Sequence, residues 1–318
     1  MPAISSSAPG KIILCGEHAV VYGQPAIALP ITDVQTRCVI LAKPNSGTQQ
    51  VLIKDHAFGL DTDLGSLKPD HPIRKTIETV LAVLGIDHLP ACEIQIHSTI
   101  PHSGGLGSSA SIAVALTRAT ANFLGHPLED TKVSNIAFEI EKLHHRTPSG
   151  IDNSVITYSK PVFYIKDTPI ELIELVHPMV LLIADSGIKG STAKAVDLVK
   201  KRWKSSPIEF EGYFVEIGGI TLKIKRLLQT GDLEEIGSLL TKNHQLLQEI
   251  GVSLSELDHL VDVAIRSGAF GAKLSGGGMG GNVVALVPPD QVDQIRSNLL
   301  RSGAAHVLVS HISPTARS

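Results

Sequence analysis

The sequence has few aromatic residues, no excess of basic charge and no long apolar run. Aromatic residues make up 4% of the 318 positions, and 28 Lys and Arg residues are opposed by 31 Asp and Glu residues. Nucleic-acid surfaces need clustered basic residues and, for single strands, stacking aromatics, so this composition argues against a nucleic-acid partner. No segment approaches the ~20 apolar residues of a membrane helix, and we expect no signal peptide because the first residues lack its layout.

Cysteine is also scarce. The three cysteines, Cys15, Cys38 and Cys92, form neither an even set nor a Cys-x-x-Cys motif. We therefore expect reduced packing residues in a cytoplasmic protein rather than a disulfide framework. No set of His, Cys and Asp residues has the spacing of a zinc site. With 43% hydrophobic residues, a chain of this length can form two domains, or one large one, around an ample core.

Alternating strand-like and helix-like patterns indicate an α/β protein. Apolar or alternating runs predict strands at 11–14, 25–29, 36–42, 51–54, 93–97, 180–184, 283–287 and 306–310. Helical spacing predicts helices at 73–84, 108–124, 133–143, 191–203, 212–229, 232–250 and 253–267, and one more opened by Pro288 and Pro289. Polar, turn-forming residues around Asp167 predict a division into domains 1–168 and 169–318.

The most informative segment is the glycine- and serine-rich stretch 101–110, which runs directly into an Ala-rich helical pattern. Glycine lets backbone N–H groups approach an anion closely, and the start of a helix adds unpaired donors and a favourable dipole. This combination predicts a nucleotide phosphate site. The segment lacks the Gly-Lys-Ser/Thr ending of a P-loop and the acidic residue of a dinucleotide fold. A helix entry with a flexible Gly-Ser cap is the alternative.

Two further glycine-marked segments lie at 8–23 and 273–282, and a Pro-Ser-Gly-Ile-Asp-Asn segment occupies 148–153. Together with 101–110, their order and content resemble the GHMP kinase superfamily over nearly the whole chain. The Gly-Glu-His sequence within 8–23, followed by an apolar run and Tyr-Gly, resembles the mevalonate kinase branch, whereas galactokinases continue with Thr-Asp-Tyr. The segment 273–282 departs from the family pattern because Met279 stands among its glycines.

The resemblance implies an α/β (α+β) two-domain GHMP-kinase fold, with an N-terminal ribosomal-protein-S5-like domain and a C-terminal ferredoxin-like domain. It also implies an active site in the cleft between these domains. The reaction that it implies is ATP-dependent phosphorylation of the 5-hydroxyl of (R)-mevalonate, with Mg²⁺ as cofactor and ATP and a small hydroxy acid as partners. A homodimer is implied as well.

Other activities of the superfamily remain as alternatives. They are phosphomevalonate kinase, mevalonate 3-kinase, homoserine kinase and diphosphomevalonate decarboxylase, of which the last releases CO₂ together with ADP. A phosphorylated substrate requires several Lys or Arg side chains in its pocket, and the sequence offers no clear cluster of them. A non-catalytic relative that only senses ligands is disfavoured because Lys11 and Asp152 are both present.

The resemblance also assigns the catalytic and metal-binding roles. Asp152 accepts the proton of the substrate hydroxyl, and Lys11 offsets developing charge; an Asx turn at Asp152 and a solvated strand-end lysine at Lys11 are the alternatives. Glu141 and Ser109 hold Mg²⁺, which needs few protein ligands because it keeps waters and phosphate oxygens; a solvent-facing glutamate is the alternative for Glu141. The implied ATP-binding residues are Ser103, Gly104, Gly105, Leu106, Gly107, Ser108 and Ser109.

Four residues are implied to bind the substrate. They are Glu17, His18, Ser149 and Thr192. In the family pattern His18 donates to polar substrate oxygens, while Glu17 orders Lys11 or the substrate. A surface turn is the alternative for the Glu17–His18 pair, and a hydroxyl at the start of a helix is the alternative for Thr192.

Overall fold

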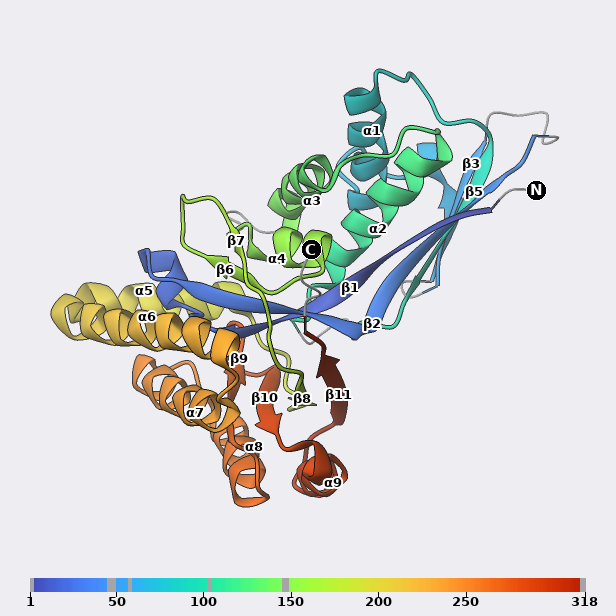
Figure 1. The fold of residues 1–318 in the computed structure, drawn as a ribbon. Helices are drawn as coiled ribbons and strands as arrows, with labels where there is room; N and C mark the ends of the chain where they lie inside the picture. Colours follow the sequence, from blue (N-terminus) through green and yellow to red (C-terminus); the bar gives the residue numbers. More distant parts are fainter. Residues whose placement is uncertain (1–2, 45–49, 57–58, 102–104, 145–148, 315–318) are drawn as a thin grey trace. The chain divides into compact units, whose positions relative to one another are not determined.

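The computed structural model describes residues 3–44, 50–56, 59–101, 105–144 and 149–314 (Figure 1). The chain divides into two compact units. Unit 1 comprises Met1–Gly10, Val34–Pro101 and Leu106–Ser159, and unit 2 comprises Lys11–Asp33, His102–Gly105 and Lys160–Ser318. Because each unit is assembled from separate segments, the division into domains 1–168 and 169–318 stays a prediction.

Unit 1 combines four helices with the strands that they cover. The helices are α1 (Pro72–Leu84), α2 (Ser108–Phe123), α3 (Asp130–His144) and α4 (Ile151–Tyr158). The strands are β3 (Val51–Asp55), β4 (Leu60–Asp63), β5 (Cys92–Ser98) and parts of β1 (Ala3–Cys15) and β2 (Ala26–Ala42), and η2 (Leu64–Ser66) is a short 3₁₀ turn. Strand β5 pairs with β3 in parallel and with β2 antiparallel.

Helices α1, α2 and α3 of unit 1 form where the apolar spacing predicted them. Val80 of α1, Ala121 of α2 and Ile136 of α3 are buried together in one cluster. Helix α1 ends at Gly85, which takes a left-handed conformation with φ 68° and returns its N–H to the last turn. The predicted helix 133–143 is confirmed as part of α3, although Leu143 is exposed rather than buried.

The first two strands are longer than the sequence pattern predicted. The separate strands expected at 25–29 and 36–42 are one strand, β2, which continues through Pro30. Proline lacks a backbone donor, but the pairings of β2 with β6 and β5 involve Ala26–Ala28 and Thr36–Ala42 and so leave Pro30 outside both ladders. Lys11, expected at the start of its strand, lies well inside β1.

Unit 2 contains the remaining elements. Its helices are α5 (Thr192–Ser205), α6 (Pro207–Thr230), α7 (Leu233–Ile250), α8 (Ser255–Arg266) and α9 (Val292–Arg301), with 3₁₀ turns η1 (Ala19–Tyr22) and η3 (Pro289–Gln291). Its strands include β6 (Val162–Tyr164), β7 (Glu171–Leu172), β8 (Met179–Asp185), β9 (Gly271–Ser275), β10 (Asn282–Val287) and β11 (His306–Ile312).

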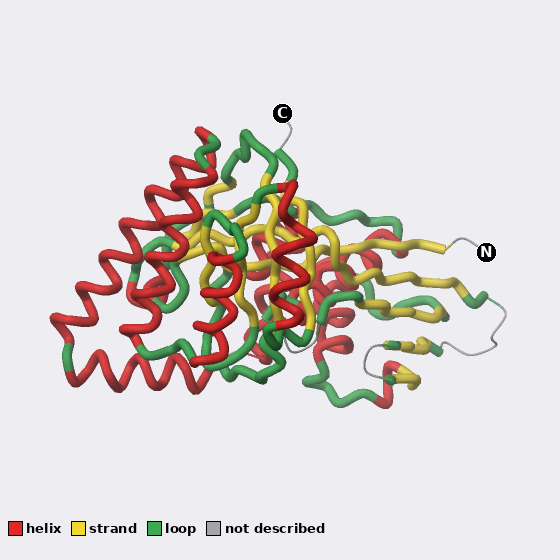
Figure 2. The backbone as a smooth tube through the Cα atoms, turned by 90° about the horizontal axis from the view of Figure 1, so that it is seen from below, coloured by secondary structure: helices red, strands yellow, loops and turns green. Residues whose placement is uncertain are grey.

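The core of unit 2 is an antiparallel sheet with strand order β11-β8-β10-β9. Helices α7 and α8 pack against β9, and α9 packs against β8 and β11 (Figure 1; helices are red and strands yellow in Figure 2). Every residue of β10 is buried, in keeping with the apolar run that follows Asn282. Strand β9 carries the buried Lys273, which donates to Glu17 of the candidate site.

Two predictions from composition can be compared with the structure. Cys15, Cys38 and Cys92 are buried and unpaired, and burial raises the pKa of the Cys15 thiol to about 12, so all three are packing residues. None of the helices in the described part of the chain combines the length and apolarity needed to cross a membrane.

Candidate functional site

Helix α2 of unit 1 begins directly after two glycines with left-handed backbones. Gly105 has φ 64° and Gly107, the N-cap, has φ 78°, values that suit glycine far better than other residues. Ser111 Oγ donates to the carbonyl of Ala8 at 2.8 Å and so ties this end of α2 to β1. The side chain of Leu106 is buried, so only its backbone can face a ligand. The predicted Ser103 and Gly104 lie outside the described residues.

The first turn of α2 and helix α3 hold a compact group of oxygen atoms. Ser109 Oγ donates to Glu141 Oε1 at 2.6 Å, and Glu141 is 3% exposed. The solvent-facing alternative for Glu141 is therefore wrong. Among the described residues, the buried Ser108 Oγ finds no hydrogen-bond partner. One carboxylate, one hydroxyl and a second hydroxyl with unused capacity fit the oxygen ligands that Mg²⁺ takes beside a phosphate.

Asp152 lies in the first turn of α4, a helix that the sequence pattern did not predict. The helix begins after Gly150, whose φ is 88°. Two contacts hold α4 in place: Asn153 Nδ2 donates to Ser134 Oγ at 2.8 Å, and Arg118 Nη2 donates to the carbonyl of Thr157 at 2.6 Å. The backbone that carries Asp152 is thus fixed by α3 and α2, which suits a residue whose carboxylate must be aimed.

Ser149 is exposed and acts on the backbone of the same turn. Its Oγ accepts from the N–H of Ile151 at 3.4 Å. This contact supports the start of α4, and the exposure of Ser149 leaves its hydroxyl accessible to a ligand.

In unit 2, the turn after β1 forces His18 into an unusual backbone conformation. A Cβ on Gly16 would lie 2.3 Å from the carbonyl of Pro25, so only glycine fits there. His18 has φ 59° and is buried, which is rare for a residue with a side chain and is typical of functional turns. Its Nε2 lies 2.9 Å from the carbonyl of Gly277. Burial lowers the pKa of His18, so the imidazole is neutral at neutral pH.

Glu17 is buried in an ion pair that the sequence did not reveal. Its carboxylate accepts from Lys273 Nζ, and its other oxygen accepts from Asn243 Nδ2 at 3.4 Å. Lys273 is fully buried and also donates to the carbonyl of Leu274. The alternative of a surface turn for Glu17 and His18 is therefore wrong. Lys273 is the one charged residue in the run Gly-Ala-Lys-Leu-Ser that leads into the glycines at 276–278. A single charge in such a run was the sequence signal that could have predicted a buried ion pair.

A second pair, formed by the buried His244 and the partly exposed Asp258, supports this one. His244 Nε2 lies 3.0 Å from Asp258 Oδ1, and His244 Nδ1 accepts from the backbone N–H of Leu274 at 3.3 Å. Burial lowers the pKa of His244 despite the carboxylate beside it. A neutral imidazole whose Nδ1 accepts must carry its proton on Nε2, and this proton is donated to Asp258. Helices α7 and α8 are thereby linked to the strand that carries Lys273.

The glycine segment after β9 packs closely against the start of α5. A Cβ on Gly277 would lie 2.9 Å from Thr192 Oγ1, and one on Gly278 would lie 2.3 Å from the carbonyl of Val252. Met279 adopts φ 57° and donates its N–H to Val252 at 2.7 Å, so the turn accommodates this departure from the family pattern. Packing requires glycine at 277 and 278 and also at 280, where a Cβ would lie 2.5 Å from the carbonyl of Ile188.

Thr192 is the first residue of α5 and is exposed. The cap of this helix is Ser191, whose Oγ accepts from the N–H of Lys194 at 3.4 Å. Thr192 is thus a hydroxyl at the start of a helix, as the alternative expected, although it is not the cap; its role in substrate binding stays a prediction. Lys11 is buried at 7% exposure. Unit 1 thus carries Ser108, Ser109, Glu141, Ser149 and Asp152, and unit 2 carries Lys11, Glu17, His18 and Thr192.

Comparison with known proteins gives matches to two family models and to curated relatives. The model of the GHMP kinases N terminal domain matches residues 71–160, and that of the GHMP kinases C terminal matches residues 224–305. The chain is 34% identical over 309 residues to a mevalonate kinase of Pyrococcus horikoshii, which covers 91% of this chain and 90% of the relative. A mevalonate kinase of Methanocaldococcus jannaschii is 33% identical over 306 residues, with 92% and 94% covered.

A solved structure of a mevalonate kinase also matches this chain over nearly its whole length. The crystal structure of L. major mevalonate kinase in complex with R-mevalonate superposes with a TM-score of 0.85 at 31% identity, covering 98% of this chain and 97% of that one. The chain belongs to the GHMP kinase family, and the predicted two-domain fold class is confirmed. Both of the curated relatives named above, which are matched over nine-tenths of this chain, are mevalonate kinases.

Proposed function

We propose that this protein transfers the γ-phosphoryl group of ATP to the 5-hydroxyl of (R)-mevalonate. The observation that carries the proposal is the buried Glu141 carboxylate 2.6 Å from Ser109 Oγ, at the glycine-capped start of α2. Backbone N–H groups at such a helix start bind phosphate, and a carboxylate and a hydroxyl beside them suit its metal counter-ion. Similarity to mevalonate kinases over nine-tenths of the chain supports the substrate.

The roles of the side chains follow from the chemistry of phosphoryl transfer. Asp152 accepts the proton of the attacking hydroxyl, and Lys11 offsets the negative charge that develops on the transferring group. The backbone of 103–109 and the hydroxyl of Ser108 bind the triphosphate. Glu17, His18, Ser149 and Thr192 position the substrate, with the neutral His18 imidazole as a hydrogen-bonding group rather than a cation.

Glu141 and Ser109 would hold the Mg²⁺ ion. When bound, this ion neutralises charge on the phosphate oxygens. The rest of catalysis is positioning, because phosphoryl transfer requires little covalent participation by the protein.

The choice of mevalonate over other substrates depends on the relatives. The structure of the L. major enzyme is described as a complex with R-mevalonate, and its 31% identity exceeds that of the matched phosphomevalonate kinase, at 18%. At 18% identity the likeness shows the fold alone. The predicted homodimer and cytoplasmic location stay predictions at this point.

The direct test is ADP release by the purified protein with Mg-ATP and (R)-mevalonate, together with assay of CO₂. We expect mevalonate-dependent ADP without CO₂, and phosphorus NMR should show a phosphomonoester at carbon 5. Release of CO₂ would support the decarboxylase instead. No ADP with mevalonate would contradict the proposal, and turnover of phosphomevalonate, mevalonate diphosphate, homoserine or galactose would then identify the alternative.

A further inference from the structure

The carbonyl of Gly277 in unit 2 accepts a hydrogen bond from His18 Nε2 at 2.9 Å. Gly277 has a glycine on each side, so this part of the segment has no side chain of its own with which to fix its position. A first anchor lies just before it, where the N–H of Leu274 donates to His244 Nδ1 at 3.3 Å. The position of the Gly277 carbonyl therefore depends on an imidazole of helix α7.

A second anchor lies just after Gly277 and leads back to the same imidazole. The N–H of Met279 donates to the carbonyl of Val252 at 2.7 Å. The next residue, Ser253, donates its hydroxyl to Asp258 Oδ1. The same carboxylate oxygen lies 3.0 Å from His244 Nε2. One chain of hydrogen bonds thus connects both ends of the glycine segment, and His244 lies within it.

The first anchor requires a neutral His244. The charged groups that face this imidazole are Asp258 of α8, Lys273 of β9 and Glu17 of the turn after β1. Burial outweighs the two carboxylates and lowers the pKa of His244, so Nδ1 carries no proton at neutral pH and can accept. Protonation would set an N–H on Nδ1 against the N–H of Leu274, two donors face to face, and the first anchor would break.

We propose that His244 is a positioning residue for the hydroxy-acid substrate. It holds both ends of the glycine segment and so fixes the Gly277 carbonyl that orients His18. The inference rests on the proposed function, in which His18 binds the substrate. It extends that function because His244 acts through the backbone of the segment and carries no assigned contact with the substrate itself.

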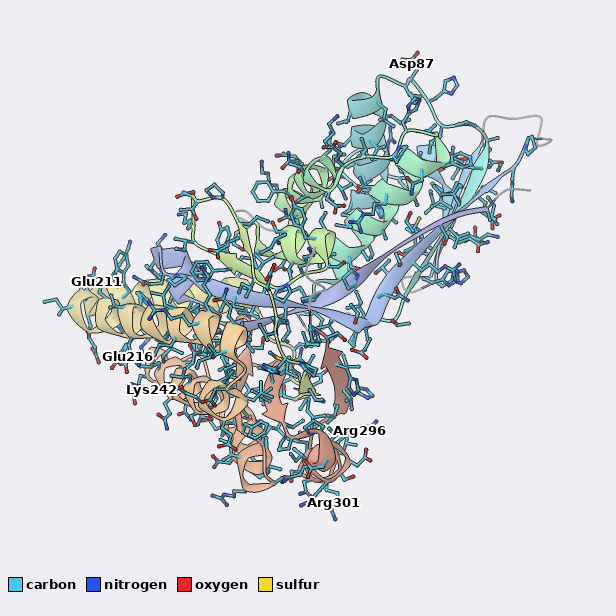
Figure 3. All side chains as sticks on the ribbon, viewed as in Figure 1. Asp87, Glu211, Glu216, Lys242, Arg296 and Arg301 are labelled. Atoms are coloured by element: carbon cyan, nitrogen blue, oxygen red, sulfur yellow. The ribbon has the colours of Figure 1, made fainter. Side chains whose placement is uncertain are left out.

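The residues before His244 on helix α7 show how specific this role is. Asn243 Nδ2 donates to Glu17 at 3.4 Å, so the same turn of α7 also contacts the second substrate residue of this group. Lys242, by contrast, pairs with Glu216 of α6 at 2.5 Å, and both side chains are exposed (Figure 3, where the two are labelled). Lys242→Gln therefore removes a contact of the same helix without touching the glycine segment, and it is the matched control.

The test compares two uncharged replacements of His244 in the full chain. H244N places an amide oxygen near the position of Nδ1 and can still accept from Leu274, whereas H244Q directs its amide toward Asp258 and leaves the Leu274 N–H without an acceptor. H244Q should raise the KM for mevalonate about tenfold, the effect of one lost buried hydrogen bond. H244N and K242Q should both stay within about threefold of wild type.

The KM for ATP separates positioning from a general loss of structure. It should change by less than about twofold in every variant, because the predicted phosphate-side residues Ser108 and Ser109 belong to unit 1. A merely structural role would reduce the folded fraction, lowering kcat while leaving both KM values unchanged. Circular dichroism checks the fold. If H244Q does not fold, Ser253→Ala replaces it as the test, with an expected rise of about threefold in the KM for mevalonate.

The pH profile provides a second readout. From about pH 7 to about pH 5, protonation of His244 should raise the wild-type KM for mevalonate, and H244N should reduce this rise because its amide does not titrate. The rise that remains belongs to His18, which is also buried. His259→Asn, an exposed histidine on α8, should keep the wild-type profile.

The outcomes separate this inference from the proposed function. A wild-type enzyme that turns over no mevalonate would contradict the proposed function alone, and the same comparison of KM values would then be made with the hydroxy substrate that it does phosphorylate. Histidine side-chain NMR of the wild-type chain should show the His244 proton on Nε2 at neutral pH, with or without substrate. A proton on Nδ1, or equal KM values for the small substrate in wild type and H244Q, would overturn the positioning role.

Discussion

The phosphate-side group of unit 1 and the buried network of unit 2 satisfy their polar atoms in opposite ways. In unit 1, Ser109 and Glu141 share one hydrogen bond, and the buried Ser108 Oγ has no partner among the described residues. In unit 2, Lys273 gives protons both to Glu17 and to a backbone carbonyl. The first group therefore has capacity left for a ligand, while the second is largely satisfied within the chain.

This difference separates the phosphate-side residues, which can still bind a ligand, from Lys273, which stabilises the buried Glu17 carboxylate. A buried charge is tolerated when its partners lie in the protein, and removing one partner leaves the other exposed to a low dielectric. A buried hydroxyl without a partner costs free energy in the unliganded state and recovers it when a ligand supplies the hydrogen bond. Variants of the phosphate-side group should therefore affect chemistry more than stability, and variants of Lys273 should do the reverse.

The largest effect that we expect is from Asp152→Asn in unit 1. The amide keeps the shape of the side chain but cannot accept the hydroxyl proton, so kcat should fall by roughly 10²–10⁴-fold. Binding of ATP, measured by calorimetry, should remain within about threefold of wild type. Asp293→Asn, an exposed position on α9, is the matched control and should retain full activity. A variant that keeps most of its rate would exclude Asp152 as the base.

The network of unit 2 should respond to Lys273→Met through stability. Methionine fills a similar volume but leaves the Glu17 carboxylate buried without its cation, which costs about 3–5 kcal/mol. Denaturant unfolding measures this loss directly. The exposed Lys200→Met on α5 should change stability by less than about 0.5 kcal/mol. If the two lysine variants proved equally stable, the pair would not support the fold.

Local patterns predicted the elements whose signals are local. Helix α1 ends at Gly85, and α2 begins at the glycines before Ser108, because both boundaries depend on residues that change the backbone within one turn. Strand β10 was likewise predicted from its apolar run. Such features require no knowledge of distant partners.

The features that the sequence did not predict depend on distant contacts. Strand β2 continues through Pro30 and pairs near its two ends with strands far along the chain, Ala26–Ala28 with β6 and Thr36–Ala42 with β5. The burial of Lys273 is acceptable only because Glu17, 256 positions away in the chain, neutralises it. Helix α4 was missed because it has only eight residues, too few to show a period. Asp152 was thus identified by resemblance while its helical setting was not.

The pH dependence of stability should differ between the two units. Burial lowers the pKa of both His18 and His244 in unit 2 from the ordinary value of 6.5. The unfolded chain therefore takes up their protons first, and stability falls as the pH drops below about 6.5. Thermal midpoints between pH 7 and pH 5 measure the slope, which His244→Asn should reduce. An unchanged slope would show that His244 is not held neutral.

In unit 1, the loss of stability in acid begins at a lower pH than in unit 2. Lys43 and Gln95 hold the pKa of Glu93 at about 2, against an ordinary value of 4.5. Its contribution to stability is complete above pH 4.5 and is lost as the pH falls from 4.5 toward 2. Glu93→Gln should therefore reduce the slope of the thermal midpoint only in that lower range. A change of slope near pH 6 in this variant would contradict the assignment.

The smallest effect on stability should come from Ser108→Ala in unit 1. Because the Ser108 hydroxyl has no partner among the described residues, its removal should change the free energy of unfolding by less than about 0.5 kcal/mol. The KM for ATP should rise by roughly tenfold, the value of one hydrogen bond to a charged phosphate. Ser111→Ala, one turn further along α2, is the matched control, because Ser111 Oγ donates to Ala8 at 2.8 Å and its loss should cost about 1 kcal/mol. Suppose instead that Ser108→Ala destabilised the protein as much as Ser111→Ala and left the KM for ATP unchanged. Ser108 would then be a structural residue, and its hydroxyl would not be reserved for a ligand.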